Sequence, residues 1–203
     1  IVTKSALVAR DADILGPMGQ KGLARVALSL TSLDAGLSRR MEPRAAAPQR
    51  RLWALRQLNA SGCPTAVMLA PIIPAINDHE LEALIRAAAV SGAKGASFIV
   101  LRLPLEVRDL FVEWLEEHFP DRAKRVMRYV RELHGGKDYD PQWGKRLSGE
   151  GVYADLIRRR FQRAADQHGL SRENSPLKTD LFRAPAAETP QFSFMDMLTT
   201  GDG

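Results

Sequence analysis

The sequence predicts an α/β fold built on parallel strands, and two observations support this prediction. Four short runs of residues are apolar or β-branched without interruption, whereas strands with one solvated face alternate in polarity. Helical patterns separate these runs, so strands and helices alternate along the chain as they do in βα units. The expected strands are Ile1–Thr3, Val26–Thr31, Thr65–Ala70 and Ser97–Leu101, and the expected helices between them are Ala6–Leu15, Pro48–Ala60 and Asn77–Ser91.

The segment Pro48–Ala60 carries the clearest helix pattern. Proline is favoured in the first turn of a helix, and Gly62 follows as a typical C-terminal stop. The apolar stripe consists of Leu52, Leu55 and Leu58. We therefore expect this helix to pack against the sheet.

The segment Asn77–Ser91 is expected to begin with a capping box. Asn77 is a favoured N-cap residue, and Glu80 stands three residues further on. Gly92 follows as the stop, and the apolar stripe consists of Leu81, Leu84, Ile85 and Ala88. This pattern predicts a third helix on the sheet.

After Leu101 only helical patterns are found, and this change suggests a division of the chain. The expected helices are Leu105–Phe119, with Val107, Leu110, Phe111, Trp114 and Leu115 on one face, then Arg122–Leu133 and Tyr153–Ala165. From Ser171 onward the chain is rich in Pro, Ser, Thr and Ala, which predicts disorder. We expect a sheet domain over residues 1–104, a helical extension over 105–170 and a disordered tail over 171–203.

Composition excludes several classes of protein. No apolar run approaches the 18 or so residues that a membrane-spanning helix needs, so no membrane association is expected. A single cysteine, Cys63, excludes a disulfide framework and a metal site built from several cysteines of this chain. The first residues carry no charged leader of the kind that starts a signal peptide, and a cytoplasmic protein is expected. The four histidines are scattered, and we expect all of them at the surface.

Basic residues are concentrated in one stretch of the chain. Between Asp121 and Arg163 there are 12 Lys and Arg residues against 6 Asp and Glu, although the formal charge of the whole chain is only +5. A basic patch of this kind contacts phosphates in many nucleic-acid-binding proteins. The stretch Arg122–Arg163 is therefore a candidate nucleic-acid-binding module, with a solvated helix surface as the alternative.

Ligands of parallel α/β proteins bind at the carboxyl ends of the strands, and several polar residues fall there. Lys4 follows the first strand, Ser29 and Thr31 belong to the second, and Arg102 follows the fourth. Such a set suits a carboxylate or phosphate group, although Lys4 could equally be solvated and Ser29 bonded to the backbone. Glu42, between the second strand and the next helix, suits either a salt-bridged turn or a pocket wall.

Together the strand-end sequences resemble a known family. The segments that carry the resemblance are Ile1–Ser5, Arg10–Asp11, Val26–Leu30, Glu42–Pro43, Leu69–Pro74 with Asn77–Asp78, and Leu101–Pro104. In this order and spacing they resemble radical S-adenosylmethionine (SAM) proteins of the spore photoproduct lyase-like group, which are often labelled DNA repair photolyases. The resemblance covers residues 1–170.

The resemblance implies the C-terminal part of a partial (β/α)6 barrel with about four parallel strands. Such barrels bind SAM beside a [4Fe–4S] cluster, and reductive cleavage of SAM yields a radical that abstracts hydrogen from the substrate. By similarity, Lys4 and Ser29 would contact the SAM carboxylate, and Ala70 would lie against the adenosyl group. Thr31, Glu42 and Arg102 are further candidates for the pocket wall. The substrate stays open, with nucleic acid as one candidate.

The chain departs from the family in one important respect. The family's cluster loop, Cys-x3-Cys-x2-Cys, is absent, as is its glycine-rich segment for the SAM amine. Both precede the matching region in the family, so we expect this chain to be a fragment of a longer enzyme and inactive by itself. A relative that lacks the cluster is the alternative.

The segment Gln191–Phe194 loosely resembles peptides that dock on the replication sliding clamp. Short apolar segments within disordered tails are typical of such docking peptides. A sliding clamp is therefore a second expected partner, and a tail without a partner is the alternative.

Overall fold

The computed structural model describes residues 1–139, 141–142, 145–172 and 176–183. Its centre is a four-stranded parallel sheet in which the strands lie in the order β1-β2-β3-β4. The strands are β1 Val2–Thr3, β2 Val26–Ser29, β3 Thr65–Ile72 and β4 Gly95–Val100. The expected α/β class and the parallel sheet are thus confirmed, although four strands do not by themselves identify a barrel.

Strand bounds differ from the predicted ones by one or two residues at an end, and β4 begins two residues before the predicted Ser97 and ends one before Leu101. β2 ends at Ser29, so Thr31 stands beyond the strand, although Leu30 still donates a backbone hydrogen bond to Met68. β3 extends to Ile72 through an irregular register with β4. The C-terminal edge of the sheet is consequently uneven, and residues 29–31 lie beside the middle of β3.

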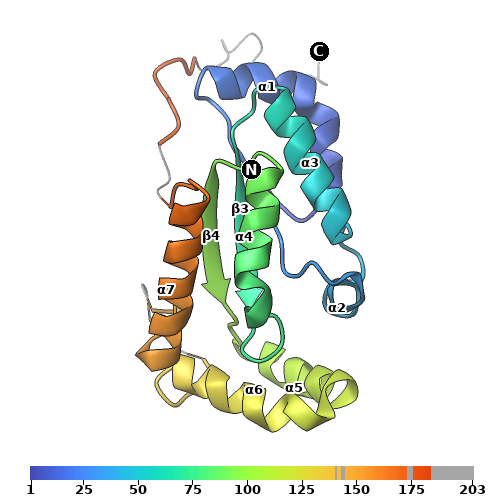
Figure 1. Ribbon diagram of the computed structural model, residues 1–203, viewed down its shortest axis with the longest axis vertical. Helices are drawn as coiled ribbons and strands as arrows, with labels where there is room; N and C mark the ends of the chain where they lie inside the picture. The colour runs from blue at the N-terminus through green and yellow to red at the C-terminus, as the bar shows by residue number, and fades with distance from the viewer. Residues whose placement is uncertain (140, 143–144, 173–175, 184–203) are drawn as a thin grey trace, which may run out of the picture.

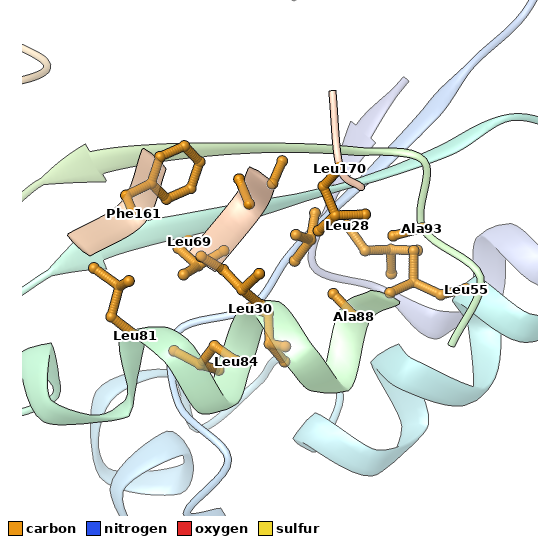
Figure 2. Packing of buried hydrophobic residues seen from close by; sticks show 14 of the residues in the cluster. Leu28, Leu30, Leu55, Leu69, Leu81, Leu84, Ala88, Ala93, Phe161 and Leu170 are labelled. Carbon is orange, nitrogen blue, oxygen red and sulfur yellow. The ribbon is translucent and has the colours of Figure 1, made fainter. Parts of the chain in front are cut away.

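Helices cover one face of the sheet. The 3-10 helix η1 Ala6–Asp11 leads into α1 Ala12–Gln20, and α3 Pro48–Ala60, α4 Leu81–Val90 and α7 Gly151–Gln167 follow. In Figure 1, α4 lies in front of β3, with α7 on one side of it and α3 on the other, and α4 contacts both of these helices. Figure 2 shows Leu28, Leu69, Leu84 and Phe161 in the apolar core between helices and strands.

The first helical region is longer than the sequence predicts and is divided into two. The expected helix Ala6–Leu15 begins as η1 and continues as α1 past Pro17 to Gln20. A Cβ atom at Gly16 would lie 2.3 Å from the carbonyl oxygen of Ser61. Glycine therefore permits close packing of α1 against the turn that follows α3, and this contact accompanies the extra turn of helix.

A second apolar cluster lies at the carboxyl end of the strands. There α2 Ala35–Met41, α5 Val107–His118 and α6 Pro120–Leu133 surround buried residues such as Ile73, Leu103 and Leu115. In Figure 1 the arrowhead of β4 points toward α5 and α6. The predicted stripe on α5 is only partly correct, because Leu115 is buried while Leu110 is 63% exposed.

The helix α7, which lies in the predicted helical extension over residues 105–170, belongs to the layer that covers the sheet. Its Phe161 ring lies 4.8 Å from the ring of Phe98 in β4, and Ile157 is fully buried. Immediately after α7, Ser171 accepts a hydrogen bond from Ala96 and donates one to Lys94. Residues 145–172 thus return to the outer edge of β4.

Part of the segment that is expected to be disordered, residues 176–183, is described by the structure. It lies at the end of the sheet opposite α5 and α6. The backbone N–H of Lys178 donates to the carbonyl of Gly22, and Pro176 and Leu177 line a cavity there with Lys94 and Gly95. Among the described residues, no helix is long and apolar enough to cross a membrane.

The predicted capping box at the start of α4 is wrong. The Asn77 side chain is buried and accepts from Ile73 N–H while it donates to the carbonyls of Thr31 and Pro71. The Glu80 carboxylate accepts from Ser32 and Leu33. Both side chains therefore hold the loop after β2, a role that spacing along one helix does not reveal.

Candidate functional site

The predicted site residues gather at the carboxyl ends of the strands, on the face of the sheet opposite the helices. Successive side chains of a strand point to opposite faces, and Leu28 and Leu69 point into the helix-covered core. Ser29 and Ala70 therefore point to the other, inner face. Together with Lys4 and Arg102 they line a cavity of about 630 Å³, and Met68 and Ile99 are among its other lining residues. Four of the six residues named from the sequence thus line one cavity, and Thr31 and Glu42 are not among its lining residues.

Glu42 is the centre of a charged network at the edge of this cavity. Its Oε1 lies 2.7 Å from Lys4 Nζ and accepts a 3.1 Å hydrogen bond from the Thr31 hydroxyl. Its Oε2 lies 2.5 Å from Arg51 Nη2. Burial alone raises the pKa of the Glu42 carboxyl, but hydrogen bonds and charge from Lys4 and Arg51 outweigh burial and lower this pKa. Glu42 is thus a carboxylate held between two cations.

Arg51 is the member of this network that the sequence analysis missed. Its side chain is 1% exposed, and it donates to the carbonyl oxygens of Ala46 and Ser29 as well as to Glu42. Arg51, Leu55 and Leu58 are spaced i, i+4 and i+7, so helical geometry alone places this arginine on the apolar face of α3. A buried arginine needs such partners for its donors, and here three acceptors supply them.

The hydroxyls of Ser29 and Thr31 hold the strands together at this edge. The Ser29 hydroxyl donates to the carbonyl oxygen of Ala70 at 3.2 Å, and the single proton of the Thr31 hydroxyl is shared between this carbonyl, at 3.1 Å, and Glu42 Oε1. The alternative in which Ser29 bonds to the backbone therefore describes this structure. Lys4, whose side chain is 49% exposed, is the cation of the network that solvent reaches.

Arg102 lines the cavity from the β4 side and is not part of the Glu42 network. The residue before it, Leu101, accepts a 2.9 Å hydrogen bond from His134 Nε2. His134 is 2% exposed, so the expectation that all histidines lie at the surface is wrong for this residue. The buried His134 holds the backbone beside Arg102 in place.

Several arginines of the stretch 122–163 are paired within the protein. Arg131 lies 2.7 Å from Asp138, Arg160 lies 2.7 Å from Glu82, and Arg158 pairs with Asp155. Exposed basic side chains without an ion pair among the described residues include those of Arg122, Lys124, Arg125, Arg128, Lys137, Arg159 and Arg163. The basic surface of α6 and α7 is accordingly smaller than the sequence suggested.

The described residues contain no group of three or more His, Cys, Asp or Glu side chains that could hold a metal ion. Cys63 is buried just before the start of β3, whereas Lys4 lies at the carboxyl end of the strands. Burial raises the pKa of the Cys63 thiol. The segment Gln191–Phe194, expected to dock on a sliding clamp, lies outside the described residues.

Comparison with known proteins yields relatives without an assigned activity. No protein-family model matches the chain. Uncharacterized proteins of Mycobacterium tuberculosis and Mycobacterium bovis are each 30% identical to it over 178 residues, which cover 87% of this chain and 48% of theirs. An uncharacterized protein of Acidianus two-tailed virus is 35% identical over 74 residues, or 36% of this chain and 24% of its own. The chain spans about half the length of the mycobacterial relatives it matches.

Proposed function

We propose that this chain forms the SAM-binding part of a radical SAM enzyme that abstracts hydrogen from a substrate not yet identified. The observation that carries the proposal is the inner face of the parallel sheet. Its carboxyl edge presents a solvent-accessible cation, Lys4, beside small residues and a cavity of about 630 Å³. Cavities of this size at the carboxyl ends of parallel strands are common ligand sites.

The residues of the cavity suit the chemistry of SAM. The Lys4 ammonium is half exposed and has three donors, so it can contact a ligand carboxylate while it stays paired with Glu42, and Arg102 offers a second cation on the other side. Ala70 and Ile99 provide an apolar wall for the adenosyl group. Ser29 and Thr31 act indirectly, because their hydroxyls donate to the Ala70 carbonyl and fix that wall.

The described residues do not suit a [4Fe–4S] cluster, since Cys63 is the single cysteine and lies at the other end of β3. In radical SAM enzymes the cluster supplies the electron that cleaves SAM. The proposal therefore requires cysteine ligands from outside this chain. Relatives about twice its length are consistent with that requirement, and this chain alone is expected to be inactive.

The experiment is to purify the native protein without oxygen, measure its iron and sulfide, and assay 5′-deoxyadenosine formation from SAM with a chemical reductant. We expect both iron and product. Lys4→Ala should raise the SAM concentration for half-maximal rate about tenfold, because a charge-assisted contact is lost.

The matched control is Lys21→Ala, which removes an exposed lysine that follows α1, and it should leave the rate unchanged. Native protein without iron, or without 5′-deoxyadenosine formation, would contradict the proposal. An equal loss in both lysine variants would show that Lys4 has no specific role.

The exposed cations of α6 support a second candidate function, nucleic-acid binding by residues 122–163. Lys124, Arg125 and Arg128 are exposed on this helix. Replacing Arg125 and Arg128 together should weaken salt-sensitive binding to DNA or RNA. Arg158 and Arg160 serve as the comparison, because both are already paired with carboxylates. Binding that is undetectable or insensitive to salt would exclude this function.

A further inference from the structure

A second cavity, of about 440 Å³, lies between η1 and α3. It shares no lining residue with the cavity on the inner face. Its polar lining consists of Ser5, Arg10, Arg50 and the Trp53 indole, and its apolar lining consists of Ala6, Leu7, Ala9 and Ala46. The cavity thus combines cations with apolar and aromatic surface.

Arg50 and Trp53 form a stacked pair in this cavity. The guanidinium carbon of Arg50 lies 4.5 Å from the centre of the Trp53 ring, and both side chains line the cavity. A flat heterocycle that enters therefore meets a guanidinium plane or an indole, and both stack on nucleic-acid bases. This pair supplies an attraction for planar ring systems that a lone arginine lacks.

Arg10 supplies the second cation of the cavity. Its side chain is 79% exposed, and its ion pair is with the neighbouring Asp11, which is itself exposed. Ion pairs between exposed side chains are weak, so an incoming phosphate can compete with Asp11 for this guanidinium. Arg10 is therefore available to an anionic ligand.

The chain around α3 carries a strong excess of positive charge. Residues 39–56 include six arginines and one acidic residue, Glu42, which Lys4 and Arg51 already neutralise. The exposed arginines of this segment include Arg39, Arg40, Arg44 and Arg50, and none of these four pairs with a carboxylate of the described residues. Their combined field attracts anions toward the cavity.

We propose that the cavity between η1 and α3 binds a nucleotide unit, with the heterocycle against the Arg50–Trp53 pair and the phosphate at Arg10. A neutral aromatic ligand would leave the cations unused, and an acidic peptide would leave the stacking surface unused. The proposal goes beyond SAM binding on the inner face and requires no cluster. A free nucleotide and a nucleotide of a single strand present the same chemistry to this cavity.

The test is calorimetric titration of the full chain with AMP, adenosine and inorganic phosphate. AMP should bind more tightly than either of its halves, and added salt should weaken it. Arg50→Ala and Trp53→Leu should each weaken AMP binding about tenfold, the equivalent of one lost charge-assisted or stacking contact. Trp53→Phe keeps an aromatic plane and should bind nearly as well as the wild type, which guards against loss of binding through misfolding.

Two control variants separate this cavity from other surfaces. Lys21→Ala removes an exposed lysine that belongs to neither proposed site and should not change AMP binding. Lys4→Ala alters the inner face and should not change it either, so the outcome is independent of SAM binding. AMP binding that Lys4→Ala abolishes, or that survives both Arg50→Ala and Trp53→Leu, would overturn the proposal.

A short single-stranded oligonucleotide distinguishes the two sources of the ligand. If the ligand belongs to a strand, the oligonucleotide should bind more tightly than AMP, and Arg44→Ser should weaken the oligonucleotide alone. If the ligand is a free nucleotide, AMP should bind at least as tightly. Failure of both AMP and the oligonucleotide to bind would refute the site.

Discussion

The two faces of the sheet differ in what their side chains do. The helix-covered face carries Leu28 and Leu69, which are at most 1% exposed, and it supplies the apolar core. The inner face carries small or partly exposed residues such as Ala66, Met68 and Ser97, which line cavities. The strands thus alternate between residues buried in the core and residues that line cavities. The difference shows that a continuous apolar run need not mean burial on both faces.

The largest expected effect tests this division between adjacent residues of β3. Leu69→Ala should lower the free energy of unfolding by about 3 to 5 kcal/mol, because it removes buried methyl groups and leaves a cavity. Met68→Ala, on the inner face, should cost less than about 1 kcal/mol. Urea denaturation measures both values. Equal losses would show that the inner face is as important for stability as the outer one.

A smaller loss of stability is expected on replacement of Arg51, which extends from α3 to Ser29 of β2 and to Glu42. Arg51→Met should lower the free energy of unfolding by about 2 kcal/mol, because Ser29, Ala46 and Glu42 lose a buried donor. Lys4 and Thr31 still hold Glu42, which limits the loss. Lys4→Ala should cost less than about 1 kcal/mol, since exposed ion pairs contribute little. If Lys4→Ala costs as much as Arg51→Met in urea denaturation, burial does not decide the strength of the two pairs.

The smallest expected effect is the pH dependence that Glu42 contributes. Its folded-state pKa lies below the ordinary value of about 4.3, so its ionised form stabilises the folded protein. This contribution is present above the ordinary pKa and is lost as the pH falls through the lower folded-state pKa. Thermal unfolding from neutral to acidic pH should therefore show a shallower acid loss in Glu42→Gln than in the wild type. Parallel curves would contradict the lowered pKa.

Much of the fold follows from local pattern. Continuous apolar runs locate all four strands, and the helix Pro48–Ala60 has the predicted bounds because its proline and Gly62 signal both ends. Long-range partners explain the failures. Glu80 bonds to Ser32 and Leu33 instead of capping its own helix, and Phe161 brings α7 to Phe98 of β4. The spacing of residues within one segment cannot predict either of these long-range contacts.

The sequence placed four of its six candidate residues around the cavity that the structure shows, but it did not reveal the charged network at the edge of this cavity. Rules for strand ends place Lys4, Ser29 and Arg102 around one cavity, and the structure agrees. The sequence left Glu42 as a turn or a pocket wall, because nothing local shows that two cations converge on it. Arg51 was overlooked because an arginine next to a leucine stripe usually lies on the solvated side of a helix. Its i, i+4, i+7 spacing with Leu55 and Leu58 is what places it on the apolar face.

The order of the strands has a consequence for the synthesis of the chain. Each strand pairs with the one before it, so every βα unit can dock on an existing edge as it leaves the ribosome. The partners of Glu42 and the carbonyl that accepts from Ser29 and Thr31 all occur by Ala70. The charged network of the inner face can therefore assemble before α4 to α7 are translated, as an early product of vectorial folding.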